Sequence, residues 1–270
     1  MRLFQIYYNE ETLASLDQGF IPLDNSKSER PDFYEYWPIR QALLSQNFLD
    51  DEYIGFFSPR LKEKTNLTFD QMAEKINHAR SEVISFSPCF EEIACYPNSF
   101  IQGDAVHPGL LKTAQRIFNR LGIKINLATL IQDQTRTIYS NYFVATYRFW
   151  KEWLQLSEQI FEISENKNSI LGRSLNSKVK HRTSSSYAMK VFIMERLVSI
   201  LLELRNIDAE IGIDFNKIPT TWPEGDRLFF TLMDLDALKG HYIKTNLSVY
   251  QRFYEERRRQ ILRRLALETR

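Results

Sequence analysis

One segment of the chain combines a carboxylate and an imidazole at a spacing suited to proton transfer. Asp104 and His107 lie in the run 102–109, a glycine-bounded loop that opens a helical pattern. Either side chain can accept a proton from a hydroxyl group. The alternative is that Asp104 only favours the positive end of the following helix. The pattern predicts a general base here, with Gln102 as a neighbouring substrate contact.

A second candidate for acid–base chemistry interrupts an apolar helical pattern. Glu195 and Arg196 fall between Met194 and Leu197. Charged groups persist in apolar surroundings when they are paired or hydrogen-bonded. Glu195 is therefore a candidate base or orienting group, and Arg196 is a candidate substrate-binding residue. The alternative is that the pair marks the solvent edge of the helix.

Two strand-like runs, Arg2–Asn9 and Glu52–Pro59, each end in polar residues where a helical or loop segment begins. Strands of a parallel sheet are buried on both faces and read as nearly continuous apolar runs, and ligands bind beyond their carboxyl ends. The residues predicted at this floor of a binding site are Tyr7, Tyr8, Asn9, Ser58 and Arg60. Because strand side chains alternate, at least one of the two tyrosines is expected in the core.

Arg60 is a candidate clamp for a diphosphate, because its planar guanidinium matches phosphate oxygens. It is otherwise a solvated charge near Lys62 and Lys64. Asp and Asn in turns can contact a ligand or can bond their own backbone, and both interpretations are kept. Further candidate substrate or nucleotide contacts are Asp24, Arg30, Arg40 and Asn141.

The elements that would position these residues alternate between strand and helix up to residue 135, which favours an α/β class. Helical spacing is expected over residues 36–47, 68–79 and 108–121, with Gly122 as a C-terminal cap, and a third strand over 82–86. The turn-rich run 10–32 is expected to be a loop that covers a ligand.

Long helices are expected after residue 142, over 147–165, 187–206 and 248–268. The run 166–186, rich in Asn, Ser and Lys, is interpreted as a flexible excursion. The apolar letters RLFFTLMDL within 212–242 are strand-like, but that segment remains ambiguous. These patterns divide the chain into residues 1–206 and a C-terminal extension, 207–270.

Composition limits the classes of function. The chain has 270 residues, of which 43% are hydrophobic, so it can bury a full core. A net charge of +1 argues against electrostatic capture of nucleic acid. Cys89 and Cys95 lack the spacing of a disulfide framework or a zinc cluster. With no signal peptide or membrane span expected, the predicted location is the cytoplasm, and the alternative is peripheral attachment to the inner face of the membrane.

The run 139–163 (YSNYFVATYRFWKEWLQLSEQIFEI), followed by 187–202 (YAMKVFIMERLVSILL), resembles a bacterial family of polysaccharide-locus glycosyltransferases with a GT-A-like fold. In that family a small polar residue and an Asn precede a strand and a helix, and a later Glu-Arg-Leu helix packs beside them. Tyr53-Ile54-Gly55-Phe56 stands where the family has the strand that reaches its sugar site. The likeness covers about residues 1–205.

The resemblance implies a GT-A-like, Rossmann-like mixed sheet flanked by helices, with a helical C-terminal part. It also implies a nucleotide-sugar donor, a glycan or lipid-linked acceptor, and a role in making surface polysaccharide. The chain departs from metal-dependent members in one respect. Ser58-Pro59-Arg60 takes the place of the Asp-x-Asp that would hold a divalent Mn or Mg ion. A metal-independent transferase is therefore expected, and the alternative is a non-catalytic carbohydrate-binding or assembly module.

Two further features are kept as weaker hypotheses. Asp234-Leu235-Asp236 is the only literal Asp-x-Asp in the chain and is kept as a candidate metal site, although it comes too late in the chain order to replace the missing motif. The run 247–270 carries seven arginines among aromatic and aliphatic residues, and it could lie on an anionic membrane or against another protein. The alternative is a packed terminal helix with a basic outer face.

Overall fold

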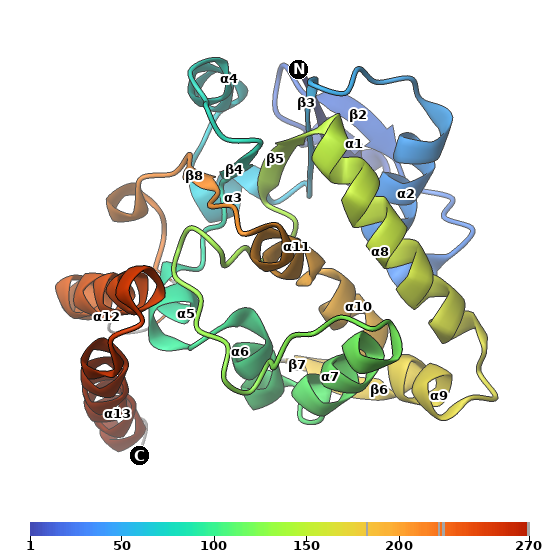
Figure 1. The fold of residues 1–270 in the computed structure, drawn as a ribbon. Coiled ribbons are helices and arrows are strands. Elements are labelled where there is room, and N and C mark those ends of the chain that lie inside the picture. Colours follow the sequence, from blue (N-terminus) through green and yellow to red (C-terminus); the bar gives the residue numbers. More distant parts are fainter. Residues whose placement is uncertain (182, 221, 223–224, 269–270) are drawn as a thin grey trace.

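A six-stranded mixed sheet lies in the upper part of the molecule as drawn in Figure 1. The computed structural model describes residues 1–181, 183–220, 222 and 225–268. The sheet has the order β2-β1-β3-β5-β4-β8. Its strands are β1 (Arg2–Tyr7), β2 (Ile21–Asp24), β3 (Tyr53–Phe57), β4 (Val83–Ser85), β5 (Phe143–Thr146) and β8 (Glu210–Ile211).

The direction of β5 decides which residues meet at the edge of the sheet. Strand β1 pairs in parallel with β2 and β3, and β4 pairs in parallel with β8. β5 lies between β3 and β4 and is antiparallel to both. The residues that precede β5 therefore lie beside those that follow β3 and β4.

Each face of the sheet is covered by its own apolar cluster, as the alternation of strand side chains requires. On one face Phe4, Ile54 and Phe56 pack with α2 (Tyr36–Ser45), α8 (Tyr147–Glu165) and α11 (Leu197–Arg205). On the other face Leu3 and Phe57 pack with α3 (Leu61–Thr65) and α4 (Phe69–Asn77). Trp150 of α8 donates from its indole nitrogen to the Ile54 carbonyl at 2.9 Å and so fixes α8 on the sheet.

The remaining elements lie beyond these layers. They are α1 (Glu10–Ala14), η1 (Pro31–Phe33), α5 (Phe90–Cys95), α6 (Ser99–Val106), α7 (Leu110–Arg120), α9 (Ile170–Asn176), β6 (Lys178–His181), β7 (Thr183–Ala188), α10 (Met189–Met194), η2 (Phe215–Lys217), α12 (Gly225–Thr245) and α13 (Ser248–Glu268). β6 and β7 form a separate two-stranded sheet. α12 and α13 pair with each other at one end of the molecule, beside α5 (Figure 1).

Several expected elements are confirmed, and their local signals explain why. The helix expected over 68–79 begins after Thr68, whose side chain accepts from the Gln71 N–H while Gln71 bonds back. The helix expected over 108–121 ends before Gly122, which has a φ of 73°. The helices over 147–165 and 248–268 have the expected bounds.

Other expectations were wrong. The run 10–32 is not one loop, because it contains α1 and the edge strand β2, and 166–186 contains α9 and the β6–β7 hairpin. The strand-like letters RLFFTLMDL lie inside α12, where Leu228, Leu232 and Leu235 pack against α5 at helical spacing. The helix expected over 187–206 is two helices, broken at Glu195 and Arg196.

The C-terminal part is attached to the sheet. β8 extends the sheet beside β4, and α12 packs on α5 through the apolar cluster they share. Within the described ranges, no helix combines the length and the apolar character that crossing a bilayer requires.

Candidate functional site

Polar residues from three strands gather at one edge of the sheet, as the strand directions require. Tyr8 follows β1, Ser58 follows β3, and Asn141 and Tyr142 precede the antiparallel β5. The Ser58 hydroxyl and the Tyr142 hydroxyl are 2.7 Å apart. The predicted site floor is therefore assembled at the carboxyl ends of β1 and β3, although Ser58 itself is buried and bonded to the protein.

Two carboxylates are drawn together at this edge. Glu35, which immediately precedes α2, and Glu195, at the break between α10 and α11, interact electrostatically. The pKa of Glu35 is raised to about 7, first by burial and then by repulsion from Glu195; Lys64 and hydrogen bonds from Asn141 and Tyr8 act in the opposite direction. Burial also raises the pKa of Glu195, against the attraction of Arg196 and Lys64.

The backbone around these carboxylates adopts sparsely populated conformations. Ser140 and Asn141 have φ values of 57° and 55°, and Tyr34, next to Glu35, has φ 49° and ψ −126°. Such conformations cost of order 1–3 kcal/mol for residues other than glycine and cluster at functional sites. The strain at Asn141 aims its side chain at Glu35.

Asn141 also offers an unused acceptor. Its side chain is buried, with 4% exposure, and its Oδ1 atom has no hydrogen-bond partner among the described residues. The Tyr139 hydroxyl, from the same segment, is likewise buried without such a partner. Buried polar groups are normally paired, so both atoms are ready to bond a ligand that enters here.

A polar pocket of about 430 Å³ opens between these elements. This volume lies within the range of about 300–1,000 Å³ typical of small-molecule sites. Among the residues that line it are Arg60, Lys64, Gln102, His107, Ser140, Glu195 and Arg196. The pocket therefore unites Glu195 with two cations from the segment after β3 and with polar residues of α6.

Arg196 anchors the wall of this pocket. The residue is 5% exposed, and its guanidinium donates to the Ser99 carbonyl, the Phe192 carbonyl and the Gln102 Oε1 atom, each at 2.8 Å. Burial lowers the pKa of Arg196, partly opposed by Glu195. The predicted contact residues Gln102 and Arg196 thus meet, and they hold each other in place.

The predicted Asp104–His107 pair is separated by the structure. The segment 102–106 is part of α6 rather than a loop. Asp104 accepts from the backbone N–H groups of Gly109 and Leu111, both at 3.0 Å, so it stabilises the start of α7 as the alternative held. His107 is buried, stacks on Phe192 with ring centroids 3.6 Å apart, and does line the pocket.

Arg60 and Lys64 are the two cations that the segment after β3 contributes to the pocket. The Arg60 side chain is 63% exposed and pairs with Glu63 at 2.5 Å. Exposed pairs of this kind contribute roughly 0–1 kcal/mol. Arg60 can therefore exchange Glu63 for an anionic ligand at little cost. Lys64 lies 5.1 Å above the Tyr142 ring and acts electrostatically on both carboxylates.

Two of the predicted floor residues, Tyr7 and Asn9, and the predicted contact Asp24 make local hydrogen bonds instead. Asn9 caps α1 by accepting from the Thr12 N–H at 2.8 Å. Asp24 accepts from the Ser26 N–H at 2.8 Å, and Tyr7 bonds to Asp24. Burial and the contact with Asp24 raise the pKa of Tyr7.

Two predicted nucleotide contacts lie elsewhere. Arg30 pairs with Asp32 and Glu165 beside a separate cavity that the buried Lys190 also lines. Arg40 of α2 pairs with Glu158 of α8 at 2.7 Å and joins these helices. Neither residue lines the polar pocket.

The literal Asp-x-Asp does not form one site. Asp234 is exposed and pairs with Arg257 of α13, whereas Asp236 is buried and lies 3.5 Å from the buried Lys239. Within the described residues, no group of three or more His, Cys, Asp or Glu side chains is placed to hold a metal ion.

No family model, curated protein or solved structure matches the chain. The site must therefore be interpreted from its own chemistry.

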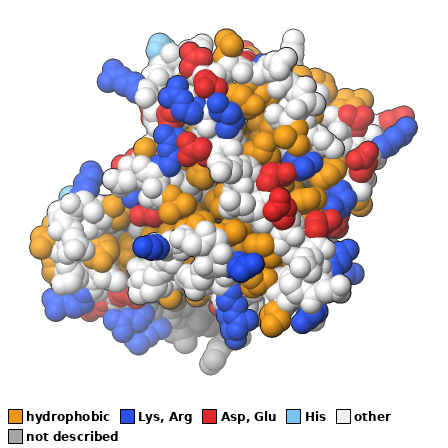
Figure 2. Space-filling model, turned by 45° about the vertical axis from the view of Figure 1, so that its right-hand side comes forward, with side chains coloured by type: hydrophobic (Ala, Val, Ile, Leu, Met, Phe, Trp, Pro, Cys, Tyr) orange, Lys and Arg blue, Asp and Glu red, His pale blue; other side chains and the backbone are white. Residues whose placement is uncertain are grey.

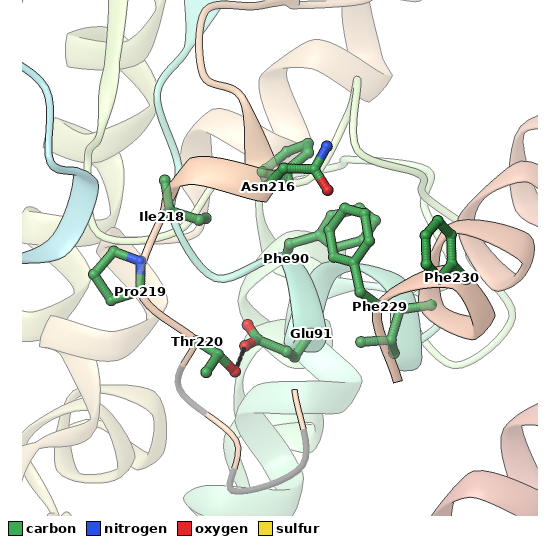
Figure 3. Close-up of a pocket in the computed structure, with 10 residues that line it drawn as sticks. Phe90, Glu91, Asn216, Ile218, Pro219, Thr220, Phe229 and Phe230 are labelled. Carbon is green, nitrogen blue, oxygen red and sulfur yellow. Dashed lines mark hydrogen bonds between the residues drawn. The ribbon is translucent and has the colours of Figure 1, made fainter. Parts of the chain in front are cut away.

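A second, more apolar pocket of about 200 Å³ adjoins the first through Pro219, which lines both. Figure 3 shows the rings of Phe90 and Phe229 within it, with Phe230 further along the helix and Glu91 bonded to Thr220 below. The surface seen in Figure 2 carries interspersed acidic and basic side chains, in accord with the small net charge.

Glu35 is the functional candidate that the sequence pattern missed. It lies between two tyrosines in a run without apolar periodicity, and no spacing links it to Glu195. Only the path of the chain from η1 into α2 brings it to the edge of the sheet.

Proposed function

We propose that this protein is a bacterial glycosyltransferase of GT-A-like fold that moves a sugar from a nucleotide-sugar donor to a glycan or lipid-linked acceptor, in the synthesis of surface polysaccharide. The observation that carries the proposal is the Glu35–Glu195 carboxylate pair beside Lys64 and Arg60, at the carboxyl ends of β1 and β3. Open α/β sheets bind ligands at this edge.

The cations suit the leaving group of the donor. A diphosphate develops negative charge as the bond to the sugar breaks, and guanidinium and ammonium groups stabilise that charge. Arg60 is exposed and weakly paired, and Lys64 lines the same pocket. In this proposal the diphosphate lies between them, and the sugar points toward Glu195.

The carboxylates suit the proton of the acceptor. The acceptor hydroxyl oxygen would bond to the anomeric carbon while the bond from that carbon to the diphosphate oxygen breaks. The hydroxyl proton would pass to the Glu35–Glu195 pair, in which burial raises the pKa of both carboxyl groups above the ordinary value, the direction that suits a general base. Glu195 lines the pocket and would take the proton, and Glu35 behind it would stabilise the charge change as a positioning residue.

The unpaired Oδ1 of Asn141 and hydroxyl of Tyr139 support a polyhydroxylated ligand. A sugar presents hydroxyl groups that can donate to the amide oxygen and bond the phenol. Ser140, between them, lines the pocket.

A divalent cation does not fit the site as built. Ser58 is bonded to Tyr142, and Arg60 brings a positive charge where paired carboxylates would be needed. The proposed reaction therefore has no step through a metal ion.

The proposal is tested by a thermal-shift screen of the purified protein against nucleotide diphosphates and nucleotide sugars, each with EDTA and with Mn²⁺. A ligand that binds the native state raises its apparent stability. A shift that survives EDTA supports the proposal and names the nucleotide. A shift only with Mn²⁺ overturns metal independence, and no shift with any donor favours a non-catalytic module.

A further inference from the structure

The hairpin of α12 and α13 presents large apolar side chains to solvent. Thirteen large hydrophobic residues are exposed in the described part of the chain, and five of them lie between residues 230 and 253. They are Phe230 (82% exposed), Met233 (38%), Leu247 (54%), Val249 (39%) and Phe253 (48%). Such a concentration on a small segment marks an interaction surface rather than scattered exposure.

The hairpin that carries these exposed side chains is well packed against the rest of the protein. The inner sides of both helices are fully used, because Leu228, Leu232 and Leu235 of α12 and Tyr254 of α13 are buried against α5. The Tyr254 hydroxyl also donates to the Cys95 carbonyl at 2.8 Å. The exposed side chains therefore project from the opposite, outer sides of a well-anchored hairpin.

The two helices run antiparallel, and their contacts place the exposed residues on a common outer surface. Asp234 pairs with Arg257 at 2.9 Å, and His241 stacks on Tyr250, which fixes the register of the hairpin. Phe230 and Met233 are three residues apart on α12, and Val249 and Phe253 are four apart on α13. Each pair therefore shares one helix face.

A basic stripe borders this apolar surface. Arg252, Arg259 and Arg263 are exposed and recur at intervals of seven and four residues, which places them along one side of α13. At 100° per residue this stripe lies next to the Val249–Phe253 face. Aromatic side chains flanked by arginines on a helix surface fit an interface where apolar lipid tails meet anionic head groups.

We propose that the outer surface of the α12–α13 hairpin docks on an anionic lipid bilayer. Phe230 and Phe253 enter the head-group region, and Arg252, Arg259 and Arg263 meet lipid phosphates. Charge complementarity selects this occupant, because an apolar protein partner would not require the arginine stripe. Phe230 also lines the apolar pocket that adjoins the polar site, so docking would hold that pocket at the membrane surface.

Docking does not depend on the transferase reaction, so it is tested by vesicle flotation without any donor or acceptor. The full chain is mixed with vesicles of phosphatidylcholine alone and with vesicles that also contain phosphatidylglycerol, at low and high salt. We expect flotation with the anionic vesicles and its loss at high salt, because the attraction between arginines and lipid phosphates is screened.

Three sets of variants locate the docking surface. Phe230→Ala and Phe253→Ala should each weaken partitioning by about tenfold, and each of Arg252→Gln, Arg259→Gln and Arg263→Gln by about fivefold. The matched controls Leu49→Ala and Ile170→Ala remove side chains that are 73% and 67% exposed outside the hairpin, and they should float like the wild type. Thermal unfolding of every variant confirms that it is folded.

The proposal is overturned if the wild type stays with the unbound fraction at low salt, or if the hairpin variants and the controls float equally. Sedimentation velocity supplies a further test of the occupant. A dimer that dissociates on the Phe230→Ala and Phe253→Ala substitutions would assign the surface to a second copy of the chain instead.

Discussion

Glu35 and Glu195 are held close enough for the second carboxylate to raise the pKa of the first, although they come from segments far apart in the chain. Burial raises the pKa of both carboxyl groups, so in this site both are protonated more readily than exposed carboxylates are. The ionised form of Glu35 is stabilised by the charge of Lys64 and by hydrogen bonds from Asn141 and Tyr8, which lower its pKa. This relationship underlies both the proposed chemistry and its pH dependence.

Stability should fall as pH rises through the range in which Glu35 keeps its proton only in the folded state. The pKa of Glu35 is about 7 in the fold, against an ordinary value of 4.5. Between those values the folded state binds more protons than the unfolded chain, so the free energy of unfolding decreases with pH. Urea unfolding of the wild type should show a decrease in the free energy of unfolding on the order of 1–3 kcal/mol between pH 5 and pH 8. Glu35→Gln should not show this decrease.

The matched control for this experiment is Glu29→Gln, which neutralises an exposed carboxylate of the preceding loop. This variant should keep the wild-type dependence on pH. If Glu35→Gln and the wild type lose the same stability between the two pH values, Glu35 does not hold a proton in the fold.

Arg60→Ala should weaken the binding of a nucleoside diphosphate more than that of the nucleoside, because only the diphosphate would contact the guanidinium. An exposed charge-assisted contact suggests a loss of roughly tenfold in affinity. Isothermal titration with both ligands measures the difference. Arg148→Ala is the control, since Arg148 is 57% exposed and paired with Glu82 outside the pocket. Equal losses for both ligands would remove Arg60 from the diphosphate site.

Asn141 allows a test of backbone strain separately from its side chain. Its φ of 55° favours glycine, so Asn141→Gly should be more stable than Asn141→Ala by about 1 kcal/mol. Both variants lose the hydrogen bond to Glu35, and the pKa of Glu35 should rise in both. Chemical denaturation measures the first effect and NMR titration of the carboxyl the second. Equal stability of the two variants would show that the left-handed backbone is not strained.

Lys239 should be a major determinant of how α12 is anchored. Its buried ammonium donates to the carbonyls of Ile93, Tyr96 and Gln132 and lies 3.5 Å from Asp236. Lys239→Met leaves the carboxylate buried without its cation and should cost about 3–5 kcal/mol. The double variant Asp236→Asn/Lys239→Met should lose less than the sum of the single variants, as measured by denaturant unfolding. Strict additivity would mean that the two charges do not interact.

The sequence predicted those elements whose local signals agree with their tertiary context. Thr68 and Gln71 form a capping box, and the apolar spacing of residues 147–165 matches a helix that is buried on one side. β2 was missed because Ile21–Asp24 is short, carries a proline and lies at the sheet edge, where a missing N–H is tolerated. The letters RLFFTLMDL fit either a strand or a helix, and packing on α5 decides for the helix.

The candidate site was predicted in part for a similar reason. The predicted strand ends correctly indicated the edge of the sheet where Tyr8 and Asn141 both bond to Glu35. The charged residues Glu195 and Arg196, which interrupt an apolar helical pattern, line the pocket. Asp104 was assigned chemistry, but its carboxylate instead bonds the first turn of α7. Glu35 has no local signature, since its partners are supplied entirely by long-range contacts.

The most direct test of the central claim is the release of nucleoside diphosphate from a bound nucleotide sugar, measured in EDTA for the wild type, Glu195→Gln and Glu29→Gln. We expect turnover by the wild type and the control. Glu195→Gln should bind the donor with unchanged affinity and release product about 10²–10⁴ times more slowly. A donor that binds in this pocket but is turned over equally by Glu195→Gln would contradict the account.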